Sequence, residues 1–408
     1  MTLRDLRGYG ALEATFGPGP QLVWGPNAAG KTSLLEAIVL LAWGRSHRTS
    51  IDAELIRWGT DLARVEGIVE PDVMPGLLAG QPGAEYPGPG HTSPETIEVA
   101  LVRSGTAAGR KRIRVNGVPR RAAGLAGLFR TVVFAPEEML LVAGSPGLRR
   151  SAIDTLASQR SPAYARELAT YARTLQQRNS LLRAIREETA GRAELRFWDA
   201  AFLDSGGMLV EERLALLDAF AGPLARAHAE IAPDEAAVAP LRIRYETNAP
   251  AQDGERPRDA LARRLVETAD KEIWNGSTLI GPHRDDLVFE QGGRDLSTFA
   301  SRGQQRTAIL AFKLAELDLL TELDGRPPLL LLDDVFSELD PERRGHLVRR
   351  IAALPQAFVT TTTLDDLDPE LRARATSWEV VAGTGDTGAA ADAVAAPGAR
   401  LVGPALHR

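Results

Sequence analysis

The sequence predicts an α/β fold in which the N-terminal and C-terminal segments together build one lobe and a mainly helical lobe is inserted between them. Three observations support this prediction. A glycine-rich loop at residues 25–32 lies between an apolar extended run and a run with helical periodicity. A leucine-rich run at residues 329–332, typical of a fully buried strand, ends in two aspartates. In the intervening segment apolar residues recur at helical spacing, as at Tyr164, Leu168 and Tyr171.

Length and composition limit the class of protein. The chain has 408 residues, too many for one ordinary hydrophobic core, so two or three domains are expected. No apolar stretch approaches the roughly 18–20 residues that span a bilayer, and the N-terminal run MTLRDLRGYG has no apolar signal core. The absence of cysteine excludes disulfides, thiolate nucleophiles and cysteine zinc sites. We therefore expect a cytoplasmic protein without membrane contact, whose net charge of −6 limits nucleic-acid binding to local basic faces.

Residues 25–33, GPNAAGKTS, match the loop that binds nucleotide phosphates. In such a loop the backbone N–H groups face the phosphates, the lysine reaches the β and γ oxygens, and the following hydroxyl binds Mg²⁺. Lys31 is one of only four lysines in this arginine-rich chain, and a compact ammonium suits that role better than a guanidinium. The expected nucleotide-binding residues are Gly25, Pro26, Asn27, Ala28, Ala29, Gly30, Lys31, Thr32 and Ser33, with Lys31 also catalytic and Thr32 also a magnesium ligand.

Changes of pattern along the chain suggest its domain organisation. Residues 1–145 combine short strands with the phosphate loop and include a Pro- and Gly-rich stretch, residues 71–95, that we interpret as an irregular insertion. Residues 146–270 are mostly helical, without the sustained heptads of a coiled coil. Residues 271–383 return to strands and complete the first lobe. Residues 384–408 are rich in Ala, Gly and Pro without any period, and we expect them to be disordered.

Two acids follow the leucine-rich run and form a Walker B strand. In nucleotide-binding folds such a strand lies beside the phosphate-loop strand, and its acids meet the magnesium ion at the carboxyl end of the sheet. We predict Asp333 as a magnesium ligand and Asp334 as the residue that orients or deprotonates the attacking water. The alternative, a buried strand that ends in a helix cap, is less favoured because an independent phosphate loop is present.

A second phosphate-binding feature lies in the stretch SRGQQ. Ser301, Gly303 and Gln304 precede a helical run whose N-terminus attracts anions. The stretch resembles the signature motif of ABC-type ATPases, and SELD at residues 337–340 resembles their D-loop. In that class the signature motif completes the ATP site of a second subunit. The resemblance therefore implies ATP and Mg²⁺ as cofactors and a head-to-tail homodimer. In it Ser301, Gly303 and Gln304 contact the nucleotide across the interface, and Ser301 is catalytic. The alternative is a helix start with solvated polar residues.

Motifs along almost the whole chain resemble those of the RecF family of bacterial DNA replication and repair proteins. They are LRDLRGYG, GPNAAGKTSLLEAI, GRSHRTSIDAELIRWG, RVNG, VVFAPEEMLLVAGSPGLRRSAID, YARTLQQRNSLLR, LIGPHRDDLVF, SRGQQRTAILAFKLAE and LLLLDDVFSELD. GSPGLRR, RNSLLR and GPHRDDL distinguish this family from ABC-type ATPases at large. Only residues 71–95 and the C-terminal tail fall outside the resemblance.

The resemblance implies an ABC/SMC-type ATPase head, lobe I, with a helical lobe II in place of a long coiled coil. It implies an ATP-dependent dimer that binds double-stranded or gapped DNA. It further implies RecR and RecO as partners and a role in RecA loading during recombinational repair. ATP hydrolysis would then be weak and DNA-stimulated, and would act as the release step.

Two basic clusters are candidates for DNA contact. The run GRKRIRVNGVPRR has six basic side chains and no acid, and its Asn116-Gly117 pair predicts a tight hairpin turn. Arginine-rich hairpins suit contacts to phosphates, although a solvated surface hairpin is an equal alternative. The candidate DNA-binding residues are Arg110, Lys111, Arg112, Arg114, Arg120 and Arg121 in the hairpin, and Arg149 and Arg150 at the start of the helical lobe.

Three departures from ABC transport ATPases bear on catalysis. Asp334 stands where those proteins have glutamate, and FVTTTT at residues 358–363 has threonines where a switch histidine is expected. The run FAPEE at residues 134–138 has no magnesium-contacting glutamine. A site without these general-base partners should hydrolyse ATP slowly, which suits a timer or clamp better than a motor.

Two further clusters each allow a functional and a structural interpretation. His47 and Arg48 follow the phosphate-loop helix and are candidate nucleotide contacts, with a structural cap or turn as the alternative. GPHRDD at residues 281–286 suggests a metal site. Because neighbouring residues on a strand point to opposite faces, we favour a structural or interface role for it.

Three other functions fit parts of the pattern. A transporter ATPase would have its signature motif closer to the phosphate loop than Ser301 is to Lys31 here. A nuclease of the same superfamily would need a further acidic cluster after Asp334. A non-enzymatic scaffold would not need Lys31, Thr32 and Asp333 together.

Overall fold

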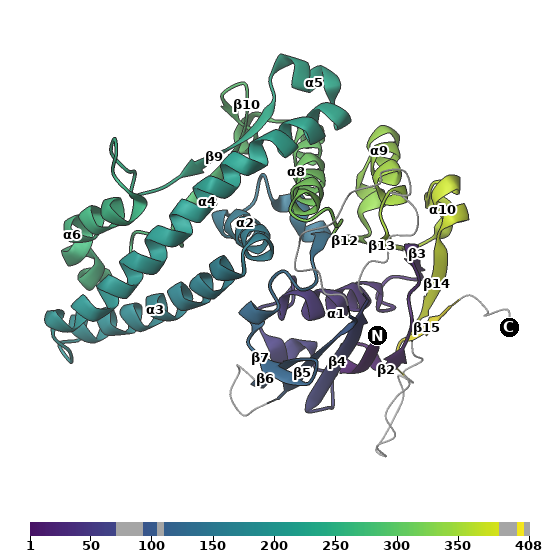
Figure 1. The fold of residues 1–408 in the computed structure, drawn as a ribbon, viewed down its shortest axis with the longest axis horizontal. Helices are drawn as coiled ribbons and strands as arrows, with labels where there is room; N and C mark the ends of the chain where they lie inside the picture. The colour runs from purple at the N-terminus through teal and green to yellow at the C-terminus, as the bar shows by residue number, and fades with distance from the viewer. Residues whose placement is uncertain (71–92, 104–109, 383–397, 404–408) are drawn as a thin grey trace. The chain divides into compact units, whose positions relative to one another are not determined.

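The computed structural model describes residues 1–70, 93–103, 110–382 and 398–403 (Figure 1). The chain divides into two compact units. We call them lobe I, which is Met1–Glu137 with Leu320–Arg408, and lobe II, which is Glu138–Leu319.

This division differs from the boundaries that the sequence suggested. Lobe II begins at Glu138 and not at residue 146, and it extends to Leu319 and not to residue 270. The later end has a simple cause: the strand β10 (Asp286–Gln291) pairs along its whole length with β9 (Leu241–Glu246). The chain after residue 270 therefore stays with lobe II until well into the long helix that follows.

Within the described residues, lobe I contains two six-stranded sheets. One is antiparallel, in the order β2-β1-β4-β5-β6-β7; the other is parallel, in the order β15-β14-β3-β13-β12-β8, except for the antiparallel edge strand β15. The first sheet comprises β1 (Thr2–Leu6), β2 (Tyr9–Glu13), β4 (Leu62–Val69), β5 (Glu95–Val102), β6 (Arg110–Val115) and β7 (Val118–Arg120). The second comprises β3 (Gly19–Trp24), β8 (Thr131–Phe134), β12 (Leu329–Asp333), β13 (Gln356–Thr361), β14 (Thr376–Val381) and β15 (Arg400–Val402).

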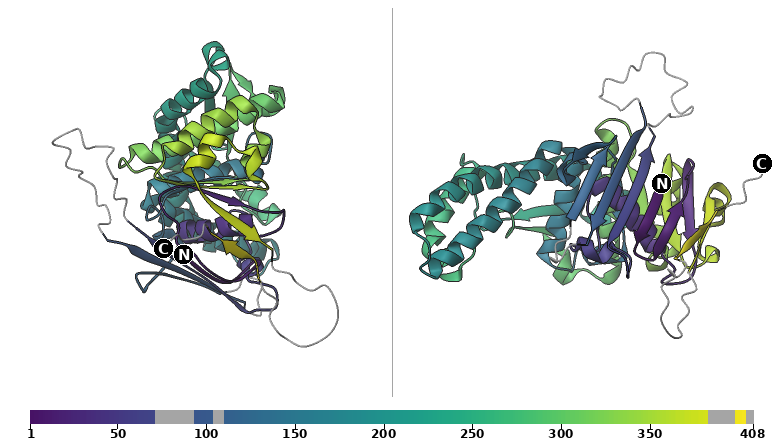
Figure 2. Two further views of the ribbon diagram at one scale, coloured as in Figure 1. Left: turned by 90° about the vertical axis from the view of Figure 1, so that its right-hand side faces the viewer. Right: turned by 90° about the horizontal axis from the view of Figure 1, so that it is seen from below.

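Helix α1 (Lys31–Trp43) is packed between the two sheets (Figure 1). Its residues are buried on every side from Leu34 to Ala42, as expected for a helix that is apolar all round. The core joins it to Val99 of the antiparallel sheet, whose strands run side by side in Figure 2 (right), and to Leu331 of the parallel sheet. This burial fixes the helix and, with it, the phosphate loop at its start. The described residues of lobe I also form the helices α9 (Pro341–Ala352) and α10 (Pro369–Arg374).

The predicted adjacency of the phosphate-loop strand and the Walker B strand is wrong. β13 lies between β3 and β12 and pairs in parallel with both. Its residues after the first are all buried, and they are apolar or β-branched, as a central strand of a covered parallel sheet requires. Thr360 of β13 is consequently opposite Val23 on one side and Asp333 on the other.

The predicted irregular segments have mixed outcomes. Residues 71–92 of the expected insertion lie outside the described residues, and β5 begins at Glu95. The expected disorder of the tail is wrong for residues 398–403. There β15 pairs with β14, and Ala399, which is buried, donates its backbone N–H to the Gly8 carbonyl at 2.9 Å. The remaining tail positions, 383–397 and 404–408, lie outside the described residues.

Lobe II is mainly helical, with one small antiparallel sheet in the order β11-β10-β9. Its helices are α2 (Pro146–Arg160), α3 (Pro162–Arg186), α4 (Leu195–Ile231), α5 (Pro233–Val238), α6 (Pro257–Asn275), α7 (Leu296–Phe299) and α8 (Arg302–Glu322), and β11 is Arg294–Asp295. α3 packs against α4 and both pack against α6. No helix in the described part of the chain is long and apolar enough to cross a bilayer.

Candidate functional site

The phosphate loop connects the end of β3 at Trp24 to the start of α1 at Lys31. Its glycines are required by the backbone. Gly25 has φ 148°, and a Cβ there would lie 2.4 Å from the Val380 carbonyl oxygen. Gly30 has φ 118°, and its Cβ would lie 3.3 Å from the Tyr9 ring and from Ala399. Side chains are therefore excluded at both ends of the loop, so its backbone can approach a ligand closely.

The first turn of α1 is open to an anion. Within the described residues, no side chain caps this helix start at Gly30, so its free N–H groups and the positive end of the helix dipole point into the loop. Lys31 Nζ donates to the carbonyl oxygens of Gly25 at 2.7 Å and Pro26 at 2.9 Å. Burial lowers the pKa of Lys31, and the charges of Asp334 and Asp333 oppose this. Phosphate oxygens would replace neutral carbonyls as partners of this cation, a stronger interaction.

The Walker B acid Asp333 is held by two hydroxyls. Thr32 Oγ1 donates to Asp333 Oδ1 at 3.0 Å, and Thr360 Oγ1 donates to the same oxygen at 2.7 Å. Asp333 and Thr360 are both buried. A hydroxyl and a carboxylate from two elements thus converge beside the phosphate loop, and such hard oxygen ligands are those that Mg²⁺ prefers. The predicted pair of magnesium ligands, Thr32 and Asp333, is brought together.

Asp334 has a left-handed backbone, with φ 54° and ψ 27°. A non-glycine residue in this region costs roughly 1–2 kcal/mol, although aspartate tolerates it better than most residues. Two hydroxyls hold the conformation: Asp334 N donates to Thr360 Oγ1 at 3.0 Å, and Ser337 Oγ donates to the Asp334 carbonyl at 2.7 Å. Strained backbone held in this way is common at functional sites. Asp334 lines the same pocket as Lys31 and Thr32.

Arg48 also lines this pocket, which is otherwise formed by the loop and the two acids. The guanidinium lies between two carboxylates, at 3.8 Å from Glu36 Oε2 and 3.7 Å from Glu137 Oε1. Glu36 is fully buried in α1 and also accepts hydrogen bonds from Arg7 at 2.8 and 2.9 Å. Burial acts to raise the pKa of Glu36, but the hydrogen bonds from Arg7 and Ser46 outweigh it and keep the carboxylate charged.

His47 does not line the pocket, in contrast to its neighbour Arg48. Its two ring nitrogens are buried and have no hydrogen-bond partner in the described part of the chain. Burial lowers the pKa of His47, so the imidazole is neutral near pH 7.

The signature residues belong to lobe II, whereas the phosphate loop belongs to lobe I. Ser301 is exposed and starts α8 with a capping box: its hydroxyl accepts from Gln304 N at 3.3 Å, and Gln304 Oε1 accepts from Ser301 N at 3.0 Å. Gly303 is half-buried in the first turn. The arrangement places an exposed serine at the start of a helix, a position whose dipole attracts an oxyanion once the capping bonds are exchanged.

The predicted DNA-binding arginines of lobe II have internal partners. Arg149 makes a bidentate pair with Asp286, both bonds at 2.8 Å, and its side chain is only 10% exposed. Arg150 donates to the Asp285 carbonyl at 2.7 Å. The geometry therefore gives Arg149 a structural role, and it is not available for DNA in this conformation.

The basic hairpin is formed as the sequence predicts. Asn116 and Gly117 join β6 to β7 with positive φ angles of 51° and 76°, the sign that a type I′ turn requires. Lys111 is half-buried and paired with Asp52 at 2.8 Å. The remaining candidates are exposed arginines, namely Arg110, Arg112, Arg114, Arg120 and Arg121. The first three alternate along β6 and thus share one face of the sheet.

The GPHRDD segment has no common metal-binding point. His283 faces Tyr171, whose hydroxyl lies 2.6 Å from Nδ1, whereas Asp285 accepts from the Tyr245 hydroxyl at 2.6 Å. Asp286 pairs with Arg149 instead. No group of three acidic or histidine side chains among the described residues could hold a metal ion. The favoured structural role fits these contacts.

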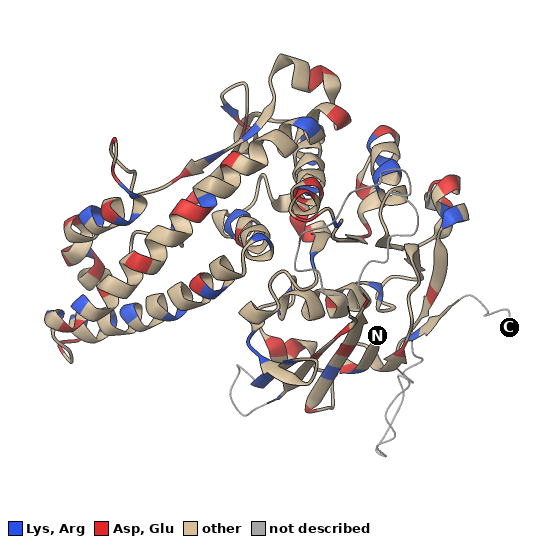
Figure 3. Ribbon diagram, in the orientation of Figure 1, with Lys and Arg blue, Asp and Glu red and all other residues tan. Residues whose placement is uncertain are grey.

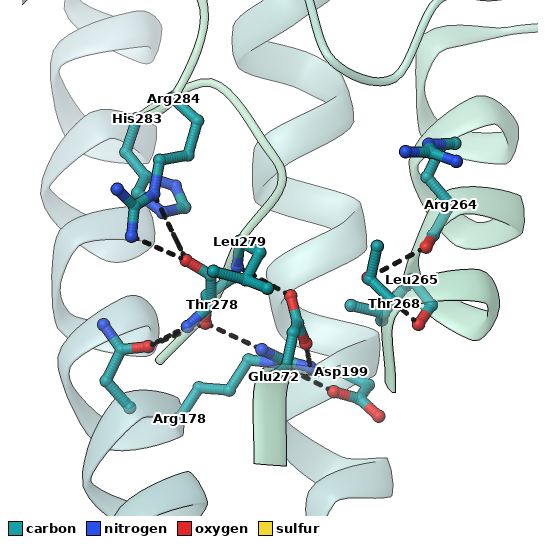
Figure 4. A network of polar contacts seen from close by, with 11 residues as sticks. Arg178, Asp199, Arg264, Leu265, Thr268, Glu272, Thr278, Leu279, His283 and Arg284 are labelled. Atoms are coloured by element: carbon teal, nitrogen blue, oxygen red, sulfur yellow. Dashed lines mark hydrogen bonds and ion pairs between the residues drawn. The ribbon is translucent and has the colours of Figure 1, made fainter. Parts of the chain in front are cut away.

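Next to this segment, a buried ion network joins three helices of lobe II (Figure 4). Arg178 of α3 donates to Glu272 of α6 at 2.7 Å, to Asp199 of α4 at 2.8 Å and to Thr278 at 2.7 Å. The Thr278 carbonyl in turn accepts from Arg284 at 3.2 and 3.3 Å. Arg178 and Glu272 are almost fully buried, so each depends on the other for its charge.

Two site residues were not predicted from the sequence. Glu36 had a visible signal, because it is the single acid in the apolar run SLLEAIVLLAW, and a lone acid in a buried helix needs a cationic partner. Thr360 had a weaker one: a run of threonines at the carboxyl end of an apolar strand places hydroxyls at the edge where ligands bind. Its contact with Asp333 depends on the strand order, which the sequence did not give.

The chain is similar over nearly its whole length to bacterial DNA repair proteins. The family model described as RecF/RecN/SMC N terminal domain matches residues 1–369. The DNA replication and repair protein RecF of Roseiflexus castenholzii is 38% identical over 94% of this chain and 98% of its own length. The protein of that name from Chloroflexus aurantiacus is 40% identical over 93% and 96%, respectively. A solved structure of the recombination mediator protein RecF-ATPrS in the RecFOR pathway has a TM-score of 0.79 and 30% identity, covering 93% of this chain and 95% of that one.

Proposed function

The chain belongs to the RecF family, and from that membership we propose that it is an ATP-dependent DNA-binding protein that acts in recombinational repair. ATP-driven dimerisation gates its binding to double-stranded or gapped DNA, and weak, DNA-stimulated ATP hydrolysis acts as the release step. RecR and RecO are its protein partners, and RecA loading is the outcome. The solved relative that acts in the RecFOR pathway supports this assignment of partners.

The pocket around the phosphate loop is the observation that carries the proposal. Lys31, Thr32, Arg48, Asp333 and Asp334 line one pocket at the carboxyl end of a parallel sheet. An ammonium, a guanidinium and free helix N–H groups suit a polyphosphate. The hydroxyl and carboxylate oxygens of Thr32 and Asp333 suit a magnesium ion, which when bound would neutralise charge on the β and γ phosphates.

Resemblance to ABC-type ATPases, in which the signature motif completes the ATP site of a second subunit, supports a dimer. The phosphate loop is in lobe I, and the exposed helix start at Ser301 and Gly303 is in lobe II. In the head-to-tail dimer that we propose, lobe II of one protomer presents these residues to the γ-phosphate held by its partner. The γ-phosphate then forms part of the protein–protein contact, so its loss weakens the dimer.

Three features support slow hydrolysis. Asp334, the candidate for orienting water, is one methylene shorter than the glutamate of transport ATPases and is held in a left-handed backbone by Thr360 and Ser337. Thr360 lies in β13, within the run where a switch histidine would otherwise assist hydrolysis. Glu137 lies after β8, in the run that has no magnesium-contacting glutamine, and it pairs with Arg48. With Asp334 as its single candidate general base, the site should hydrolyse ATP slowly, and a slow rate suits a protein that uses ATP as a switch.

Light scattering with and without ATP·Mg²⁺, followed by addition of a short duplex, tests the proposal. We expect an ATP-dependent dimer that binds the duplex, and loss of both properties in Lys31→Arg. Lys271→Arg is the matched control, since Lys271 is exposed on α6 in lobe II. A wild-type chain that stays monomeric with ATP and ignores the duplex would contradict the proposal and favour an ATPase that needs a partner protein.

A further inference from the structure

Helix α3 of lobe II has one exposed face that is basic and contains no acid. The exposed residues within its 25-residue length include Arg166, Arg173 and Arg183, which lie on one side of the helix. Figure 3 shows blue segments along this helix. The other exposed side chains on the same face are small or polar, namely Ala169, Ala172, Gln176, Gln177 and Ser180. The only acid of the helix, Glu167, is half-buried toward the opposite side.

The opposite face of α3 accounts for its position in the lobe. Tyr164, Tyr171, Arg178 and Leu182 recur at spacings of seven or four residues and are buried. Arg178 is the one arginine of this buried face, and it is neutralised by Glu272 and Asp199. The buried positive charge of α3 is thus paired with carboxylates, whereas the three arginines on its exposed face are not.

The three exposed arginines are available to an external partner. None of the ion pairs found in the described part of the chain involves Arg166, Arg173 or Arg183, and Arg173 contacts only the nearby Thr170 hydroxyl, at 3.3 Å. Many other exposed arginines of lobe II are paired, as Arg192 is with Asp270 at 2.7 Å and Arg244 with Glu290 at 2.6 Å. The lack of partners is therefore not a general property of arginines on this lobe.

The neighbouring helix α4 has exposed charge of the opposite sign. Glu211 and Asp218 are exposed and lie seven residues apart, which places them on one side of the helix. Asp204, seven residues before Glu211 on the same side, is also exposed but is paired with Arg258 at 2.6 Å. A polyanion would be repelled by that side of α4 and attracted to the exposed face of α3. This difference in charge between α4 and α3 would direct a nucleic acid to the exposed face of α3.

We propose that this face of α3, with Arg166, Arg173 and Arg183, binds the phosphate backbone of duplex DNA. The inference rests on the DNA binding proposed above and names a contact surface on lobe II for it. From Arg166 to Arg183 the helix rises about 25 Å, at 1.5 Å per residue. A duplex carries one phosphate charge per about 1.7 Å of its axis, so each arginine can meet a phosphate. The small and amide side chains between them allow close approach and supply neutral hydrogen bonds to the backbone.

The salt dependence of binding tests this surface directly. Affinity for a fluorescent duplex is measured with ATP·Mg²⁺ between 50 and 200 mM salt, for wild type and for a variant with Arg166→Gln, Arg173→Gln and Arg183→Gln. Each lost phosphate contact reduces the slope of log K against log salt by about 0.9. We expect a slope shallower by about 2.7, which means that affinity falls about 40-fold less across this range.

A matched control removes the same number of charges from the same lobe. Arg192→Gln, Arg244→Gln and Arg256→Gln alter exposed arginines that are already paired with Asp270, Glu290 and Asp259, respectively. This variant should keep the wild-type slope. A gain-of-charge variant covers the case in which a triple variant fails to fold: Ser180→Arg, on the α3 face, should steepen the slope by about 0.9.

The outcomes separate this inference from the proposed function. If wild type binds the duplex and neither α3 variant changes the slope, the surface is wrong and DNA binding stands. If wild type binds no duplex with any nucleotide, the proposed function itself fails. If the triple variant loses self-association in light scattering while its slope is unchanged, the face meets an acidic protein surface such as α4 of a second copy, and the DNA assignment is overturned.

Discussion

Thr360→Val is expected to weaken magnesium binding at the nucleotide site. Valine has nearly the same shape as threonine, so the substitution removes the hydroxyl with little change in packing. Thr360 Oγ1 donates to Asp333 Oδ1 at 2.7 Å and accepts from Asp334 N at 3.0 Å. One side chain therefore positions the magnesium ligand and the strained residue next to it.

The size of the effect follows from these two bonds. A hydrogen bond to a charged group contributes about 1.5–3 kcal/mol, and a buried N–H left without a partner costs about 1–3 kcal/mol. Thr360 is fully buried and Asp333 nearly so, so water does not replace the lost hydroxyl. Removal of a partner that orients a metal ligand typically lowers metal affinity by about 10- to 100-fold. We expect Thr360→Val to lie within this range.

A magnesium titration of nucleotide binding, followed with a fluorescent ATP analogue, measures the effect without relying on turnover. Thr360→Ser retains the hydroxyl and should restore most of the affinity. Thr361→Val is the matched control, because Thr361 is buried in the same strand but donates to the Thr363 carbonyl at 2.9 Å. If Thr360→Val shows the wild-type magnesium midpoint, or if serine is as damaging as valine, the hydroxyl does not position Asp333 and the reasoning is wrong.

Two further predictions concern the polar interior of lobe II. Burial lowers the pKa of His283 to about 4, below its value of about 6.5 in an unfolded chain. Between these values the unfolded chain binds more protons, so stability is complete above about pH 6.5 and falls by on the order of 3 kcal/mol as the pH approaches 4. Urea denaturation at pH 7 and 4.5 should show this loss in wild type and a smaller one in His283→Gln. Arg178→Met leaves Glu272 buried without its cation, and should lower the free energy of unfolding by about 3–5 kcal/mol. In the double variant with Glu272→Met most of that loss should be recovered, and an equal loss in both variants would refute the ion-pair account.

The nucleotide half-site in lobe I could be predicted from the sequence because its signals are local. The glycines, Lys31 and Thr32 are adjacent in the chain, and the leucine-rich strand brings its two acids with it. Even so, the order of the strands could not be read from these patterns. A buried parallel strand has the same apolar sequence wherever it lies in the sheet, so nothing local indicated that β13 separates β3 from β12.

The failures of prediction concern contacts between distant residues. In the sequence, Arg149 is an arginine of the kind that contacts DNA phosphates. Its structural role is visible only from its pairing with Asp286, which is more than a hundred residues away in the chain. β15 was not predicted because a strand of three residues is too short to show the alternation of apolar and polar residues. It is held in place by pairing with β14 and by burial of Ala399. The exposed face of α3 was missed for the opposite reason. Its arginines are spread over a helix instead of clustered in the sequence, and helical geometry brings them together.

The capping box at Ser301 bears on how the proposed slow hydrolysis of ATP is compatible with nearly complete dimer formation. In the single chain the Ser301 hydroxyl is engaged with Gln304 N at 3.3 Å, an exposed and neutral bond. Exchange of this bond for a contact to a γ-phosphate costs little and gains a charge-assisted one. In the proposed dimer, Ser301 and Gly303 would each contact the γ-phosphate at both ATP sites. These four hydrogen bonds would contribute about 1.5–3 kcal/mol each. Their sum exceeds the roughly 5.5 kcal/mol that moves an equilibrium from 1:99 to 99:1. The contacts would therefore set how completely ATP closes the dimer, and the rate of hydrolysis would set only how long it stays closed.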